Sequence, residues 1–204
     1  MSKIALIGAS GNAGSKILAE LVARGHAVTA IARDTSKIAA LSGVRPLSVD
    51  ANDGKALAEA LKGHDIVISA VHFLASDAET LIGAVKAAGV KRYYVVGGAG
   101  SLEAAPGLRV VDTPEFPELY KGEALKGAAF LELLKAEKGL EWSFLSPSAL
   151  FFDGPRTGKF RLGGDGLLVA ADGNSSISFA DFAIALVDEI EAPKHVRRRF
   201  TVGY

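Results

Sequence analysis

Three glycines at a fixed spacing near the N-terminus constrain the fold of this chain more than any other feature. Gly8, Gly11 and Gly14 follow the apolar run at residues 4–7 and precede a stretch with helical spacing of apolar residues. Glycines there permit a tight turn, let a ligand approach the backbone, and allow the helix to pack closely on the strand. Free N–H groups at the start of a helix attract anions. The sequence therefore predicts a phosphate-binding turn between the first strand and the first helix.

The chain continues as an alternation of short apolar runs and amphipathic segments. The strand candidates are residues 4–7, 27–32, 45–49, 66–70, 93–96 and 143–145. All but 45–49 have the continuous apolar character of strands that are buried on both faces. Helical spacing occurs between them, most extensively at about 117–137. Repeated strand–helix units predict an α/β fold of the Rossmann type, doubly wound around a mainly parallel sheet.

The chain changes character after residue 150. Residues 151–176 are rich in glycine and aspartate, and the runs 159–162 and 167–170 flank the tetrapeptide GGDG, which predicts a hairpin. An amphipathic helix at 178–191 and a last strand at 200–202 follow. We expect one Rossmann-type domain over residues 1–204, with residues 150–178 as a small C-terminal appendage on the side where a ligand would bind, too small to fold alone.

Composition excludes several classes of function. The 23 basic and 23 acidic residues cancel, so no field of one sign attracts nucleic acid or a membrane surface. The chain has no cysteine, and its four histidines lack metal-ligand spacing, so we expect no metal site. It has no leader-like N-terminus and no apolar run of membrane-spanning length. These features predict a cytoplasmic protein whose partner is a small molecule.

The end of the second predicted strand indicates which dinucleotide binds. An acidic residue there would accept hydrogen bonds from a ribose 2′-OH, whereas a cation accommodates a 2′-phosphate. The sequence AIARD places Arg33 directly after the strand, and a guanidinium grips phosphate bidentately. Asp34 follows immediately and leaves NAD(H) open. We therefore expect NADP(H) to be preferred.

Other polar and small residues follow the remaining predicted strands. Ligands of open α/β sheets bind beyond the carboxyl ends of the strands, so these residues are expected to meet in one crevice. Ser10 and Asn12 are predicted phosphate contacts, although either could instead cap the turn. Asp50 either binds the adenine amino group or caps the helix that begins near Asp53.

Five segments carry a resemblance to a known family. They are GASGNAG at 8–14, IAR at 31–33, DIVISAV at 65–71, VKRYYVVGGAGS at 90–101 and WSFLSPSALF at 142–151. With these the chain resembles the atypical short-chain dehydrogenase/reductase group, and in particular its NmrA-like, NADH-flavin-reductase-like and biliverdin-reductase-B-like members. The resemblance extends over nearly the whole chain. It implies an NAD(P)-dependent reductase more strongly than it implies any one substrate.

The resemblance also implies a set of cofactor contacts. The pyrophosphate would face the turn, the 2′-phosphate would face Arg33, and the adenosine and nicotinamide would lie at the later strand ends. The expected cofactor-binding residues are Gly8, Ser10, Gly11, Asn12, Ala13, Gly14, Arg33, Asp50, Ala51, Ser69, Ala70, Val71, Gly97, Gly98, Pro147 and Ser148.

The acid–base machinery of this group is incomplete in the sequence. Short-chain dehydrogenases that act on alcohols and carbonyls use a tyrosine with a lysine four residues later, one helical turn away. Here Lys121 directly follows Tyr120, and Ala124 occupies the expected lysine position. Either the two residues form a shifted catalytic pair, or the tyrosine anchors a loop and the lysine is solvated. Tyr120, His72 and Ser101 are the candidate catalytic residues, although His72 could be a rim histidine and Ser101 a loop residue.

The missing pair favours a substrate that needs little acid catalysis. A flavin-like molecule meets this condition, as do quinones and linear tetrapyrroles, and positioning would then account for most of the catalysis. Phe73, Phe151 and Phe152 are candidate walls for such a flat ring. The leading hypothesis is an NADPH-dependent reductase of conjugated small molecules. An NmrA-like sensor of NADP(H) without turnover and an epimerase or dehydratase remain as alternatives.

Overall fold

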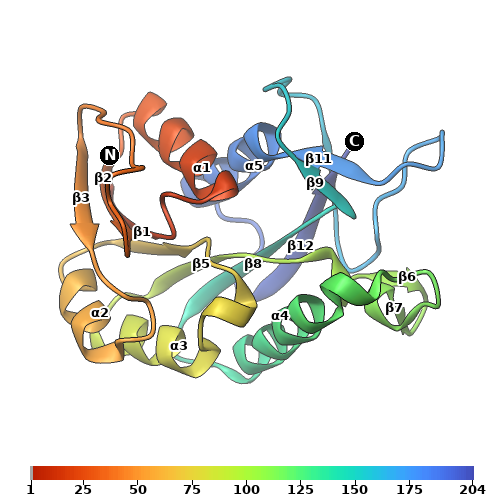
Figure 1. Ribbon diagram of the computed structural model, residues 1–204, viewed down its shortest axis with the longest axis horizontal. Coiled ribbons are helices and arrows are strands. Elements are labelled where there is room, and N and C mark those ends of the chain that lie inside the picture. Colours follow the sequence, from red (N-terminus) through yellow and green to blue (C-terminus); the bar gives the residue numbers. More distant parts are fainter. Residues whose placement is uncertain (1) are drawn as a thin grey trace.

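The computed structural model describes residues 2–204 and has an eight-stranded sheet at its centre (Figure 1). The strand order is β10-β12-β8-β5-β4-β1-β2-β3, and every neighbouring pair is parallel except β10 with β12. The strands are β1 Lys3–Ile7, β2 Ala27–Ala32, β3 Val44–Ser48, β4 Ile66–Ser69, β5 Arg92–Val96, β8 Glu141–Pro147, β10 Arg161–Gly163 and β12 Arg198–Gly203. The predicted Rossmann-type α/β class is confirmed.

Helices cover both faces of the sheet. In Figure 1, α1 and α5 lie above the sheet, and α2, α3 and α4 lie below it. They span α1 Asn12–Ala23, α2 Gly54–Leu61, α3 Ala78–Ala87, α4 Glu118–Ala136 and α5 Phe179–Glu191. Alternate residues of β1 serve the two layers, since Ile4 and Leu6 pack with α1 and α5 whereas Ala5 and Ile7 pack with α2 and α3. This burial on both faces explains the unbroken apolar runs in the sequence.

The strand order reverses at β1. Successive strands β2 and β3 are added on one side of β1, and β4, β5, β8 and β12 on the other. At such a switch point the loops beyond the carboxyl ends diverge to opposite faces and leave a crevice. The glycine turn at the end of β1 therefore lies where the topology opens a binding site.

The two outer strands of the sheet each pair with a single neighbour. The weaker strand candidate at 45–49 forms β3, which pairs with β2 alone and carries Pro46 in its middle. At the other edge, β10 has three residues and pairs with β12.

The predicted hairpin at 159–162 and 167–170 is wrong. Arg161 pairs with Gly203 of β12, while Leu167 N donates to Glu103 O, and Glu103 N donates to Asp165 O. Both halves of the expected hairpin therefore bind partners far away in the sequence, which local turn signals do not reveal. Residues 98–116 contain the small hairpin β6 Glu103–Ala105 with β7 Leu108–Arg109 and the 3₁₀ turns η2 Ala99–Ser101 and η3 Val110–Asp112.

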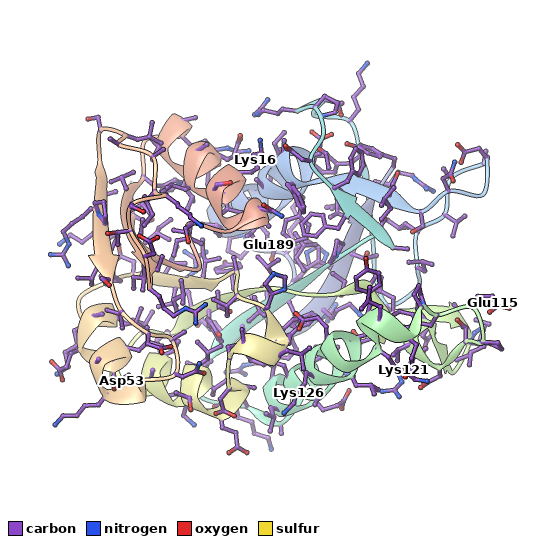
Figure 2. All side chains as sticks on the ribbon, viewed as in Figure 1. Lys16, Asp53, Glu115, Lys121, Lys126 and Glu189 are labelled. Atoms are coloured by element: carbon purple, nitrogen blue, oxygen red, sulfur yellow. The ribbon has the colours of Figure 1, made fainter. Side chains whose placement is uncertain are left out.

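The C-terminal appendage is held to α1 by ion pairs. Strands β9 Leu150–Phe152 and β11 Ser176–Ser178 pair in parallel, and the chain between them contacts the middle of α1. Lys16, which Figure 2 shows on α1, lies 3.1 Å from a carboxylate oxygen of Asp153. Arg156 donates two 2.9 Å hydrogen bonds to the buried Glu20. These hydrogen bonds lower the pKa of Glu20, although its burial acts in the opposite direction.

A buried carboxylate ties the same segment to α5. Asp181 has no solvent-exposed surface, and it accepts hydrogen bonds from Thr157 N at 2.8 Å, Gly158 N at 2.8 Å and Tyr204 Oη at 2.8 Å. The Thr157 hydroxyl donates a further bond at 2.5 Å. Burial alone would raise the pKa of Asp181, but these donors outweigh it and lower the pKa.

Asp181→Asn is expected to reduce the free energy of unfolding at pH 7 by about 1–3 kcal/mol, because hydrogen bonds to a charged acceptor are lost. Since the folded-state pKa is depressed, this stabilisation is present above the unfolded pKa and is lost as the pH falls through the folded value. Urea unfolding at pH 7 and pH 3 measures both effects. Glu115→Gln, at the exposed site that Figure 2 labels, is the control. An equal deficit at the two pH values would contradict the prediction.

Candidate active site

A cavity of about 630 Å³ opens beyond the carboxyl ends of the central strands. The glycine turn, the ends of β2, β4, β5 and β8, the start of α4 and the start of α5 all contribute to its wall. Ser10 and Asn12 line it at the glycine turn, and Phe151 and Phe179 line it at the start of α5. The volume is within the range of sites for cofactor-sized ligands.

The glycine turn brings three backbone segments into direct contact. Gly8 has φ +85°, and a Cβ atom there would lie 2.4 Å from the carbonyl oxygen of Ala70. A Cβ atom at Gly14 would lie 2.0 Å from the carbonyl oxygen of Gly8. Gly8 lines the cavity, whereas Gly14 is buried beneath it and permits the close approach of α1. Gly14 is therefore a packing residue, which corrects the expectation that it contacts the cofactor.

The first turn of α1 presents unpaired N–H groups to the cavity. The N-cap of α1 is Gly11, and no side chain caps the helix. The first helical amide with an acceptor is that of Ser15, which donates to Gly11 O, so within the described residues those of Asn12 and Ala13 have none. Ser10 also lines the cavity. Because neither Ser10 nor Asn12 caps the helix, both side chains are available to a ligand, and the site suits an anion.

Arg33 and Asp34 have different surroundings. Arg33 lines the cavity, and within residues 2–204 its guanidinium makes no ion pair or hydrogen bond. Asp34 instead accepts a 2.9 Å hydrogen bond from Ser36 N, and hydrogen bonding to Ser36 lowers the pKa of Asp34. The carboxylate is thus engaged in its own turn, while the guanidinium is free to bind a phosphate.

The ends of β3 and β4 supply the next part of the wall. Asp50, Ala51, Ala70 and Val71 all line the cavity. The N-cap of α2 is Asp53, whose side chain accepts from Ala56 N, so Asp50 does not cap this helix.

Ser69 does not reach the cavity. Its hydroxyl lies 2.9 Å from the Tyr93 hydroxyl on the neighbouring strand β5, inside the core. Ser69, expected among the cofactor-binding residues, is therefore corrected to a core residue that does not line the cavity.

Small residues at the ends of β5 and β8 line the part of the cavity that lies beyond these two strands. Gly97, Gly98, Pro147 and Ser148 line the cavity. A Cβ atom at Gly97 would lie 2.3 Å from the Phe144 ring, so only glycine fits there. The Ser148 hydroxyl and N–H both donate to Val202 O, at 3.0 and 3.1 Å, which fixes the turn after β8.

The structure separates the three catalytic candidates. Tyr120 and His72 line the cavity. Ser101 does not, because its carbonyl and hydroxyl oxygens accept from Arg199 at 3.1 and 3.4 Å on the far side of η2. The expected catalytic role of Ser101 is corrected on this ground.

Tyr120 and Lys121 do not form a pair. Figure 2 shows Lys121 near the start of α4, beside the β6–β7 hairpin. Its ammonium lies 3.3 Å from a carboxylate oxygen of Glu118, one helical turn earlier. The Tyr120 side chain remains largely exposed and makes no hydrogen bond within residues 2–204. The interpretation of these residues as a shifted catalytic pair is therefore not supported.

Glu123 and Phe179 are among the cavity residues that sequence reasoning missed. Glu123 lies one turn after Tyr120 and accepts from the N–H groups of Phe73 and Leu74 at 2.7 and 2.8 Å. Phe179, the first residue of α5, stacks edge-on against Phe151 with ring centroids 4.5 Å apart. The only sequence signal for Glu123 was its spacing from Tyr120, and Phe179 had none, since a helix start predicts no tertiary partner.

The family model for NAD(P)H-binding proteins matches residues 8–193. The chain belongs to this NAD(P)H-binding family. The match begins at the first glycine of the turn and includes every cavity-lining residue except Ile7. The residues present fit a dinucleotide, because free amides at the start of α1 and an unpaired Arg33 lie along one continuous wall.

Relatives over the full length support the family assignment. An uncharacterised Bacillus subtilis protein, YwnB, is 44% identical over 98% of this chain and 97% of its own. A crystal structure of a candidate epimerase from Bacteroides thetaiotaomicron has 44% identity and a TM-score of 0.95, covering 100% of this chain and 97% of that one. A candidate NADH-flavin reductase from Streptococcus pneumoniae has 38% identity and a TM-score of 0.84, covering 100% and 99%.

Two further features of the described residues bear on the site. Within residues 2–204 no group of three or more histidine, cysteine, aspartate or glutamate side chains is arranged to hold a metal ion. None of the helices in the same part of the chain combines the length and apolar character needed to cross a membrane.

Proposed function

We propose that this protein is an NADPH-dependent oxidoreductase that reduces a flat, conjugated small molecule such as a flavin or a quinone. The observation that carries the proposal is the single cavity that joins a dinucleotide seat to an aromatic wall. The candidate NADH-flavin reductase at 38% identity supports it. We also propose a small molecule as the partner.

Each part of the cavity has a defined task in this proposal. The amides of Asn12 and Ala13 hold the pyrophosphate, and Arg33 holds the 2′-phosphate. When bound, the nicotinamide supplies two electrons and a proton as hydride. Phe151 and Phe179 provide a face on which a planar acceptor stacks. Catalysis then consists mainly of holding the reacting atoms about 3–3.5 Å apart in a dry site.

The charges of the wall restrict the acceptor. Among the lining residues, the ones with ionisable side chains besides Tyr120 are Arg33, Asp50, His72 and Glu123. Arg33 is assigned to the cofactor, and two of the others are acids. No lysine or arginine in this wall remains to pair with a phosphate or carboxylate of the substrate. We therefore propose a ring without a required anionic group, so that any phosphate tail of a flavin would extend into solvent.

Purified protein is expected to oxidise NADPH with menadione, riboflavin and FMN, and not with benzaldehyde. Riboflavin and FMN should have KM values within about threefold, because an exposed phosphate gains little from the wall. The absorbance of the reduced nicotinamide measures all four reactions. Tight NADPH binding without turnover of any acceptor would overturn the proposal and leave a cofactor-binding sensor in its place.

An epimerase is the second candidate, because the Bacteroides relative is a candidate epimerase at 44% identity. That chemistry requires an acid–base group on the substrate, and Tyr120 is the residue that a short-chain dehydrogenase fold would use. Tyr120→Phe is expected to change menadione turnover by no more than about twofold, since hydride transfer needs no phenol. A loss of 10²-fold or more, the size typical of a general acid or base, would make Tyr120 the acid–base group that an epimerase requires.

A further inference from the structure

A carboxylate from α4 holds the segment that follows β4. Glu123 Oε1 accepts from Phe73 N at 2.7 Å and lies 3.3 Å from His72 Nδ1, while Oε2 accepts from Leu74 N at 2.8 Å. The segment is the short 3₁₀ turn η1 Phe73–Ala75 with His72 as its N-cap residue. The two backbone N–H donors, one on each oxygen, together with the His72 contact hold the carboxylate in place. His72 is therefore fixed by a residue 51 positions later in the chain.

Packing fixes the same turn from below. The Phe73 ring lies against α4 at Gly127, where a Cβ atom would be 2.7 Å from the ring. The ring also stacks on Phe144 and meets Phe130 edge-on, with centroid distances of 6.3 and 5.9 Å. The backbone of η1 is thus anchored both by Glu123 and by the packed Phe73 ring, and this anchoring places His72 at the cavity.

The contact with Glu123 differentiates the two imidazole nitrogens of His72. Nδ1 faces a carboxylate, which accepts and cannot donate, so the proton on Nδ1 is retained. Nε2 has no partner among residues 2–204, and the imidazole, with 88% of its side chain exposed, lines the cavity. Any proton that His72 exchanges with a ligand therefore passes through Nε2.

We propose that His72 is the proton donor of the reductase and that Glu123 is its positioning residue. This inference rests on the proposed function. The acceptor gains two electrons and one proton from the bound cofactor, and the negative charge left on its oxygen or nitrogen takes a second proton from Nε2. The imidazolium of His72 becomes neutral imidazole, retains its Nδ1 proton, and is reprotonated by water. The favoured acceptor is thus a quinone-type molecule, whose reduction to a hydroquinone consumes that second proton.

A comparison of two electron acceptors distinguishes the loss of proton donation from a general loss of activity. Menadione takes up a proton as well as hydride, whereas the cation methylene blue becomes neutral on accepting hydride alone. In His72→Gln, the ratio of menadione turnover to methylene blue turnover is expected to fall by about 10²-fold, the lower end of the range for general acids. In Glu123→Gln the ratio should fall by about tenfold, since the donor is present but poorly oriented. The Kd for NADPH should stay unchanged in both.

A spectroscopic measurement tests the pair without cofactor or acceptor. Long-range ¹H–¹⁵N correlation spectra at high pH report which imidazole nitrogen carries the proton. We expect His72 to be protonated on Nδ1 in the wild type and to shift toward Nε2 in Glu123→Gln, in which one amide oxygen replaces two carboxylate oxygens. His64 is the internal control, because its Nδ1 lies 3.0 Å from the carbonyl oxygen of Leu61 and its tautomer should not change.

The outcomes distinguish this inference from the function on which it rests. If the wild type reduces neither menadione nor methylene blue, the proposed function is wrong and the donor role falls with it. If the wild type reduces both but His72→Gln slows them equally, only the donor role is overturned. An Nε2-protonated His72 in the wild type, or a tautomer that Glu123→Gln leaves unchanged, would overturn the positioning role of Glu123 alone.

Discussion

Arg33→Ala is expected to weaken NADPH binding by about 10²-fold and to leave NADH binding within about twofold. The guanidinium has no partner of its own within the described residues, so its full hydrogen-bonding capacity is available to a 2′-phosphate. Charge-assisted hydrogen bonds contribute about 1.5–3 kcal/mol, and each 1.4 kcal/mol is a factor of ten in affinity. Isothermal titration with the two reduced cofactors measures the selectivity.

Two further variants make the test of Arg33 specific. Arg33→Lys keeps the charge but loses the bidentate geometry, so an intermediate loss is expected. Arg45→Ala removes an exposed arginine near the start of β3, at the opposite end of the sheet, and should affect neither cofactor. Equal losses of NADPH and NADH affinity in Arg33→Ala would show that Arg33 does not select the cofactor. A gain in NADH affinity in that variant would point to a role for Asp34.

Gly14→Ala should destabilise the protein more than any other single methyl addition in the glycine turn. The new Cβ atom would lie 2.0 Å from Gly8 O and 2.9 Å from the Gly8 carbonyl carbon. Both are backbone atoms, so α1 must move away from β1, which also displaces the amides at the cavity. Overpacking usually costs about 1–3 kcal/mol, and this backbone clash places the expected loss at or above about 3 kcal/mol. Urea unfolding measures the loss.

Gly83→Ala is the matched control for Gly14→Ala. Gly83 lies in α3 on an exposed surface, and nothing lies within 4 Å of a Cβ atom there. Alanine is favoured over glycine in a helix interior by about 0.8–1 kcal/mol, so this variant should be slightly more stable than the wild type. If Gly14→Ala is as stable as Gly83→Ala, the close contact of α1 with the glycine turn is not required by the fold.

The sequence predicted those features that depend on neighbouring residues. The glycines at residues 8–14 predict the geometry of the turn, because only glycine meets its two requirements. These are a positive φ at Gly8 and the absence of a side chain at Gly14. The strand runs were equally clear, since burial on both faces leaves an unbroken apolar segment. Arg33 could be predicted as a site residue because it directly follows β2, whose apolar run is visible in the sequence.

Features that depend on distant pairing could not be predicted in this way. Ser69 and Ser101 were polar residues near strand ends, but their hydroxyls bind Tyr93 and Arg199, whose proximity follows from the sheet order and from the course of the C-terminal segment. Glu123 acts on a turn that precedes it by about 50 residues. Hydrophobic periodicity or a motif indicates which face of a helix or strand is buried. It does not indicate which polar atom on another helix or strand completes a hydrogen bond.

The outer strands of the sheet bear on how this protein behaves when it is concentrated. An exposed strand edge with free N–H and C=O groups can pair with the edge of another molecule and start aggregation. Here β3 has five residues with Pro46, which has no N–H, at its centre, and β10 has only three residues. Neither edge offers a long template. Intermolecular growth of the sheet is thereby disfavoured, and replacing Pro46 with valine would remove one of the two barriers to it.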